Sequence, residues 1–306
     1  AVCCLSSVNL EYFEDWKHEP LFIEDIIRML DNVITYYIKH AASNPSLKKA
    51  VYSASQERSL GLGAMGFHAL LQSKSLPFES QQASALNHKV FEHINKFAHL
   101  ASRKLLLEGR EQAPDSRYYE PKRNMHLMAI APNASSGIIC GNTSPSIEPY
   151  RANAYTHKTE SGTFIIRNKH LERLLQSLDQ STPEVWESIT LNAGSVQHLD
   201  FLSLAQKAVF KTAPEIDQRW VIDHAGARQP FICQGQSLNL FVSEDISVAQ
   251  LHHLHMMAWK KGLKGLYYLR TDLKNRGSGS EKTNTTNTTA STINHKDYDV
   301  CVSCEG

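Results

Sequence analysis

Two cysteines near the carboxyl end, Cys301 and Cys304, have the spacing of a metal-binding or redox-active pair. Half a zinc site is one interpretation, but no second pair with this spacing completes four ligands. A thioredoxin-type dithiol needs a folded βαβ context, which the neighbouring sequence lacks. The third interpretation is a mobile dithiol that exchanges with a disulfide elsewhere and is then reduced from outside. Two incidental thiols are the plain alternative.

The segment before this pair is compatible with a mobile dithiol. From about residue 274 onward the sequence has few apolar side chains and no periodicity. We therefore predict that residues 273–306 form a disordered tail. A flexible tail of roughly 30 residues is long enough to reach a distant disulfide.

Other candidate residues lie inside the predicted folded part. Cys3 and Cys4 stand in an apolar run, where a buried core position is the default for cysteine. Tyr267 and Tyr268 lie on a predicted strand over residues 263–270. Neighbouring strand residues point to opposite faces, which favours one core ring and one surface ring.

A short stretch of small and hydroxyl residues follows an apolar run at residues 126–131. It consists of Pro132, Asn133, Ala134, Ser135 and Ser136. If a helix begins here, its free N–H groups and the two serine hydroxyls form an anion site suited to phosphate. An ordinary helix N-cap is the alternative.

Residues 61–66 match the pattern G-x-G-x-x-G, but their context argues against a dinucleotide-binding loop. That loop follows a strand, and an acidic residue stands about 20 positions further on. Here the preceding residues are polar, and Leu86 and Asn87 occupy the later position. We predict that these glycines let a helix pack closely against its neighbours.

The composition limits the class of protein. The chain has 306 residues, a formal net charge of +1 and six cysteines. This charge gives no reason to expect nucleic acid as a partner, and no apolar run approaches the roughly 18 residues of a membrane span. Reduced thiols without a secretory signal favour a cytoplasmic location. Helical periodicity predicts helices over residues 23–42, 65–72, 87–109, 171–178, 183–191, 202–210 and 248–262.

Mixed helices and strands predict an α/β fold in one domain over residues 1–272. Several segments then resemble, in the same order, the large subunit of class I ribonucleotide reductase. They are AVCCLSSVNL, RSLGLGAMGFHALL, IAPNASSGIICGNTSPSIEP, QRWVIDHAGARQPFICQGQSLNLF, GLKGLYYLR and the terminal cysteine pair. The resemblance covers essentially the whole chain.

The resemblance implies a role for each candidate. Cys3 is similar to one of two cysteines that reduce the substrate ribose and become a disulfide. Residues 132–136 align with the loop that holds the substrate diphosphate. Tyr267 and Tyr268 resemble the stacked pair that passes a radical from the small subunit. Cys301 and Cys304 resemble the tail dithiol that restores the active-site thiols and is reduced by thioredoxin or glutaredoxin.

The resemblance also implies missing parts. The family fold is a ten-stranded α/β barrel, and this chain corresponds to its C-terminal part followed by a flexible tail. The family's Asn-x-Cys-x-Glu finger loop, which carries the thiyl-radical cysteine, has no counterpart here. We expect it on a complementary N-terminal chain, together with the second redox cysteine and the allosteric ATP and dNTP sites. No cofactor or metal is expected on this chain, and a di-metal radical cofactor is expected on the small subunit.

The expected activity is the reduction of ribonucleoside diphosphates, with this chain inactive alone. Cys140 and Cys233 stand in apolar runs and are predicted to be core residues. The diphosphate loop has fewer hydroxyl and acidic groups than in some members, so its contacts would depend on backbone N–H groups. The tail cysteines also differ in spacing from other members. An inactive remnant, or an accessory chain that binds the small subunit or thioredoxin, is the alternative.

Overall fold

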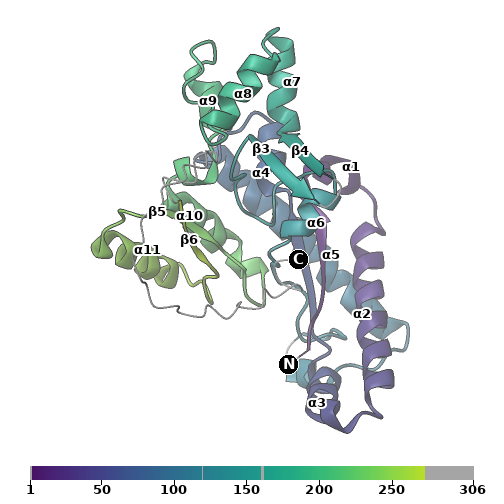
Figure 1. Ribbon diagram of the computed structural model, residues 1–306. Coiled ribbons are helices and arrows are strands. Elements are labelled where there is room, and N and C mark those ends of the chain that lie inside the picture. Colours follow the sequence, from purple (N-terminus) through teal and green to yellow (C-terminus); the bar gives the residue numbers. More distant parts are fainter. Residues whose placement is uncertain (1, 119, 160–161, 273–306) are drawn as a thin grey trace, which may run out of the picture.

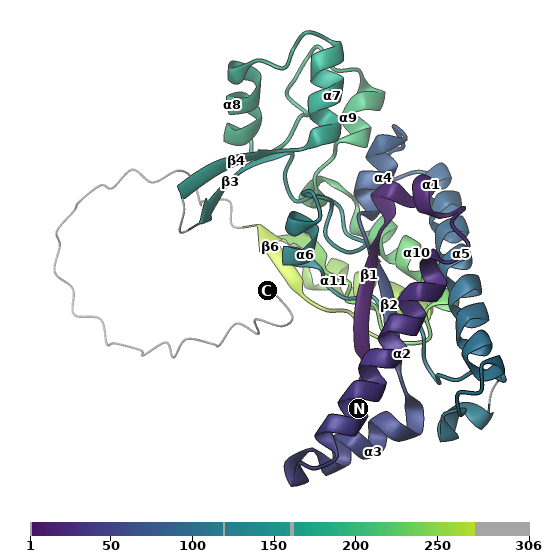
Figure 2. The same ribbon diagram turned by 90° about the vertical axis from the view of Figure 1, so that its right-hand side faces the viewer.

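The computed structural model describes residues 2–118, 120–159 and 162–272, and its centre is a row of parallel strands. The first two are β1 (Cys4–Asn9) and β2 (Leu60–Met65), which pair with Cys4 opposite Leu60. They lie side by side in Figure 2. Every residue of β2 is buried, as expected for a parallel strand with neighbours on both edges and helices beside it.

Further segments continue this row beyond β2. Residues 126–130 form a parallel bridge to β2, and residues 234–238 form a parallel bridge to them. Residues 234–238 lead into β5 (Leu240–Ser243), which pairs in parallel with β6 (Leu269–Asp272). In the part of the chain that the structure describes, β1 therefore has a strand neighbour on one edge only.

Two long helices, α2 (Phe22–Ala41) and α5 (Gln81–Leu107), pack against each other beside β1 and β2 (Figure 2). Helix α2 buries an apolar stripe at helical spacing, as its sequence predicts. Helix α5 begins six residues earlier than predicted, because the Ser80 hydroxyl accepts a hydrogen bond from the Ala83 N–H and caps it.

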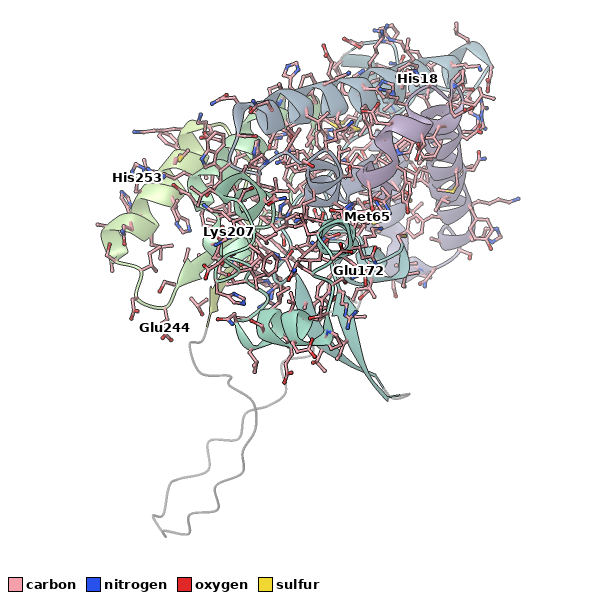
Figure 3. All side chains as sticks on the ribbon, turned by 90° about the horizontal axis from the view of Figure 1, so that it is seen from above. His18, Met65, Glu172, Lys207, Glu244 and His253 are labelled. Carbon is pink, nitrogen blue, oxygen red and sulfur yellow. The ribbon has the colours of Figure 1, made fainter. Side chains whose placement is uncertain are left out.

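The other helices beside the row are short. They are α1 (Phe13–Trp16), α3 (Lys48–Glu57), α4 (Phe67–Ser73), α6 (Ala134–Ile139), α10 (Gln218–Arg228) and α11 (Val248–Lys260), with 3-10 turns at Leu10–Tyr12, Pro45–Leu47, Pro114–Tyr118, Ala213–Glu215 and Gln229–Phe231. Side chains fill the space between these elements, and Met65, at the end of β2, lies in the packed centre of Figure 3. No helix of the described residues is long and apolar enough to cross a membrane.

A separate lobe stands at the top of Figure 1. It contains the antiparallel hairpin of β3 (Ala154–Thr159) and β4 (Gly162–Arg167). The helices α7 (Lys169–Ser177), α8 (Pro183–Leu191) and α9 (Leu204–Val209) complete it. These elements share a hydrophobic cluster of their own, distinct from the main core.

The predicted strand over residues 263–270 is wrong for most of its length, because β6 begins at Leu269. Gly262 has a φ of +76° and ends the preceding helix, so the chain turns before it can extend. The Tyr267 N–H still donates to the Leu238 carbonyl, 2.9 Å away. The segment therefore runs beside residues 234–238 without forming a regular strand.

Candidate functional site

Cys3 lies just before β1, on the face of the row that also carries Gly61. Its Sγ atom is 3.0 Å from the position that a Cβ on Gly61 would occupy, and the Ala129 Cβ is 3.2 Å from the same position. The Leu5 Cδ2 atom lies closer still to that position, at 2.3 Å, so the bare backbone of Gly61 leaves room for both the Leu5 side chain and this sulfur. The side chain of Gln234 donates to the Leu60 carbonyl at 2.8 Å and acts to lower the pKa of Cys3.

The thiol of Cys3 is protonated at neutral pH. Burial raises its pKa to about 11, and the side chain of Gln234 only partly offsets this effect. Cys4 packs against the main hydrophobic core instead, and burial raises its pKa although Arg58 acts in the opposite direction. The two neighbouring cysteines therefore lie in different environments, as expected on a strand.

Cys233 is a third thiol in this region. Burial tends to raise its pKa, but hydrogen bonds from His126 and from the N–H groups of Met128 and Leu127 lower it to about 7. Its Sγ accepts those two backbone bonds at 3.3 and 3.2 Å. The Cys233 thiol is near enough to act on Cys3, whose pKa its charge also raises. Both residues are free cysteines in the structure.

The loop before α6 is tied to the strands by Asn133. Its Nδ2 donates to the Ser7 Oγ at 2.9 Å and to the Ala131 carbonyl at 3.1 Å. Its backbone is left-handed, with a φ of +53°, and its side chain makes no hydrogen bond to the helix start. The side chain thus points to the strands, and Asn133 is not an ordinary N-cap.

Helix α6 consequently starts with open donors. Its first backbone bond runs from the Gly137 N–H to the Asn133 carbonyl, at 2.9 Å. The N–H groups of Ala134, Ser135 and Ser136 precede that bond and have no acceptor within the helix. Cys140, at the other end of α6, is exposed, so its prediction as a core residue is wrong. The short helix turns its outer residues to solvent.

The rings of Tyr267 and Tyr268 lie together, with centroids 4.1 Å apart and planes tilted by 52°. The alternative of one core ring and one surface ring is wrong, because the residues precede β6 and lack regular strand alternation. The Arg270 guanidinium lies 5.1 Å from the Tyr268 ring centroid. The Tyr268 N–H donates to the Asn239 Oδ1 at 3.0 Å.

The candidate residues thus lie next to strands of the same parallel row. Cys3 precedes β1, the Asn133 loop follows residues 126–130, and the tyrosines precede β6. Cys301 and Cys304 lie outside the described residues. Within the described ranges, no three His, Cys, Asp or Glu side chains gather as a metal site.

A known family combines these features. Residues 1–115 and 111–269 match the model described as "Ribonucleotide reductase, barrel domain". The chain belongs to this family. It is a portion of the α/β barrel, as the sequence predicts.

Individual relatives agree with this assignment. The "Ribonucleoside-diphosphate reductase large subunit" of Invertebrate iridescent virus 3 is 46% identical over all of this chain and 48% of its own length. The protein with the same description from Invertebrate iridescent virus 6 is 49% identical over 89% of this chain and 28% of its own length. The "class Id ribonucleotide reductase alpha subunit" of Actinobacillus ureae matches at a TM-score of 0.83 and 39% identity, over 89% of this chain and 50% of that one. This chain spans half or less of these relatives.

In this ribonucleotide reductase barrel, the glycine motif is part of a strand and not of a phosphate loop. Gly61 and Gly63 lie within β2, and Gly66, with a φ of +81°, precedes α4. A Cβ on Gly63 would lie 2.4 Å from the Ala129 carbonyl oxygen. The predicted helix-packing role is therefore wrong for the first two glycines, which allow strands and a thiol to approach.

Sequence reasoning about the candidate site missed Gln234, Asn239 and Glu148. Gln234 acts to lower the pKa of Cys3, and the Asn239 side chain accepts the Tyr268 N–H. Glu148 is 4% exposed, and the Asn239 N–H lies 3.3 Å from its Oε1. A charged residue within the otherwise uncharged run SPSIEPY was the available signal.

Proposed function

We propose that this chain is a working part of a ribonucleotide reductase large subunit that reduces ribonucleoside diphosphates to 2′-deoxyribonucleoside diphosphates. The observation that carries the proposal is the placement of three features on one row of strands: the Cys3 thiol, the open start of α6 and the tyrosine pair. Family membership supports the reaction class.

In the proposed reaction, Cys3 supplies part of the reducing power. The ribose loses its 2′-hydroxyl as water while two thiols become a disulfide, so that two electrons and two protons pass to the substrate. Because its pKa is raised, Cys3 holds the proton that such a step needs. Cys4 packs against the main core, and the Cys233 thiol is engaged by the backbone N–H groups of Leu127 and Met128. We therefore assign the second thiol, and the radical cysteine, to a complementary N-terminal chain.

The remaining candidates receive roles in the same scheme. The open N–H groups of α6, with Pro132 to Ser136, would hold the substrate diphosphate. Tyr267 and Tyr268 would pass a radical from the small subunit, which would hold the di-metal cofactor. Cys301 and Cys304 would restore the active-site thiols and be reduced by thioredoxin or glutaredoxin. Allosteric ATP and dNTP sites would belong to the complementary chain.

The outer edge of β1 supports the need for a complementary chain. A strand edge with unpaired N–H and C=O groups is a surface onto which another strand adds. Within the described residues, β1 pairs with β2 alone. A strand of the complementary chain would cover this edge and continue the row.

The test is the conversion of CDP to dCDP with a dithiol reductant and the small subunit present. The chain is assayed alone and together with the complementary N-terminal part. We expect activity only in the mixture. Activity of the chain alone would contradict the assignment of the missing cysteines. No activity from two folded chains would favour an inactive remnant or a binding chain.

A further inference from the structure

Glu148 is a buried carboxyl group that the proposed reaction does not use. In the sequence it stands in the segment that connects α6 to the β3–β4 hairpin, and its side chain is 4% exposed. Its Oε1 accepts the Asn239 backbone N–H at 3.3 Å. Buried carboxyl groups are costly unless they are paired, so its position calls for a physical reason.

Asn239 joins this carboxyl group to the tyrosine pair. Its Oδ1 accepts the Tyr268 N–H at 3.0 Å, while its own backbone N–H donates to Glu148 at 3.3 Å. A single residue therefore links the carboxyl group to the backbone of Tyr268.

Two cations act on Glu148. Arg270, on β6, has its guanidinium 5.1 Å from the Tyr268 ring centroid, and Arg151 follows three residues after Glu148. On the side of β5 the carboxyl group accepts a hydrogen bond from a neutral donor, the backbone N–H of Asn239. Phe241, which pairs with Arg270 in the sheet register, lies 5.9 Å from the Arg151 guanidinium. A charge on Glu148 thus attracts the arginine that covers Tyr268.

We propose that Glu148 is a positioning residue for the tyrosine pair, which acts on Tyr268 through Asn239 and through its attraction for Arg270. Its importance for radical transfer rests on the proposed function, whereas the coupling between Glu148 and Tyr268 does not. Burial raises the pKa of Glu148 to about 7, against the hydrogen bonds from Asn239 and the charges of Arg270 and Arg151. The carboxyl group therefore changes its charge in the neutral range, and the field at Tyr268 changes with it.

The test uses the full 306-residue chain with Tyr268→3-nitrotyrosine, whose phenol absorbs visible light when it ionises. An ionised Glu148 repels the phenolate and offsets the positive charge of Arg270, so both effects raise the phenol pKa. We expect Glu148→Gln to lower the titration midpoint by about 0.5 to 1 pH unit. Gln has the shape and charge of the protonated carboxyl group, so this variant keeps a state that the native chain already occupies.

Arg270→Gln gives a second, opposite measurement, because loss of the cation should raise the same midpoint. Glu244→Gln is the matched control, since Glu244 is exposed just after β5 at the periphery of the molecule (Figure 3). It should leave the midpoint unchanged. A midpoint that Glu148→Gln and Arg270→Gln leave in place, or shift in the reverse directions, overturns the proposal. The titration needs no turnover, so a failure of CDP reduction with a positive titration counts against the proposed function alone.

Discussion

The Ser7 Oγ and the Asn133 Nδ2 lie 2.9 Å apart, and this contact joins the middle of β1 to the loop before α6. The two residues are separated by 126 positions in the chain. The Asn133 side chain hydrogen-bonds to the strands and does not cap α6. The first N–H groups of α6 therefore have no acceptor from this side chain. One side chain thus both positions the loop and leaves room for an anion.

Asn133 offers a direct test of the diphosphate site. Asn133→Gly keeps the left-handed backbone but removes the hydrogen bond, whereas Asn133→Ala also strains the backbone at a φ of +53°. We expect CDP binding to weaken roughly fivefold for the glycine variant, from the loss of about 1 kcal/mol, and further for alanine. Calorimetric titration of CDP into the chain with its complementary part would measure this. Native affinity in both variants would argue against a diphosphate role.

Substitution of Gly63 tests the close approach of β2 and residues 126–130. A Cβ there would meet the Ala129 carbonyl oxygen at 2.4 Å, and backbone cannot move aside cheaply. We expect Gly63→Ala to destabilise the protein by about 2 kcal/mol and to lower Tm by roughly 4–8 °C. Gly235→Ala is the control, because nothing lies within 4 Å of its Cβ position. Equal melting temperatures for the two variants would contradict the strand-contact explanation.

Helices were the predictable part of this fold, because apolar periodicity depends on the chain's own sequence. Helix α8 has its predicted bounds, and α2 differs from its prediction by one residue at each end. Strand β2 was not predictable in this way, since its glycines weaken a strand pattern and are required only by close contacts with Cys3, Leu5 and Ala129.

The sequence allowed the residues of the candidate site to be named, but it did not allow the contacts between them to be predicted. Cys3 and the loop at Asn133 could be named from their types, and the family resemblance placed them in one site. The adjacent rings of Tyr267 and Tyr268 depend on where β6 begins, which the local sequence does not determine. Glu148 acquires its environment from Asn239, 91 positions away, so no local pattern could reveal it.

Substitution of Asp31 tests the buried ion pairs that connect α2 to the residues beside the row of strands. It is fully buried, and Arg110 Nη1 and Arg123 Nε lie 2.6 and 2.8 Å from its Oδ2. We expect Asp31→Asn to cost about 3–5 kcal/mol, because it leaves buried guanidinium groups without a counter-charge. Urea unfolding would measure the loss, with the exposed Asp25→Asn on the same helix as control.

Asp31 should also make the stability of the protein depend on pH in the acid range. Burial would raise the pKa of Asp31, but Arg58, Asn124 and Arg123 together hold it below the ordinary value of 3.8. Its contribution is therefore present above pH 3.8 and is lost as the pH falls through the lower folded pKa. The stability difference between native protein and Asp31→Asn should shrink in that acid range. A constant difference would rule out this ion cluster as its source.

The thiols of Cys233 and Cys3 should differ in their pH profiles of alkylation. With a pKa of about 7, Cys233 should reach half its maximal rate with iodoacetamide near neutral pH. Cys3, with a pKa of about 11, should react slowly below pH 9. Peptide mass spectrometry after timed labelling separates the two sites. His126→Ala should move the Cys233 profile to higher pH, and an unmoved profile would exclude the His126 hydrogen bond as its cause.

Glu148 predicts a second pH dependence of stability, opposite in sign to that of Asp31. Its folded pKa of about 7 lies above the ordinary value of 4.5, so the folded state binds its proton more tightly. The contribution is fully present below pH 4.5 and is lost as the pH rises through 7. The whole change corresponds to about 3 kcal/mol.

Urea unfolding between pH 5 and pH 8 measures this effect. We expect the native chain to lose stability over this range relative to Glu148→Gln, whose side chain does not titrate. Glu244→Gln should follow the native chain, because its carboxyl group is exposed. Parallel pH curves for the native chain and Glu148→Gln would contradict a folded pKa near 7. The influence of Glu148 on Arg270 and Tyr268 would then not change across the neutral range.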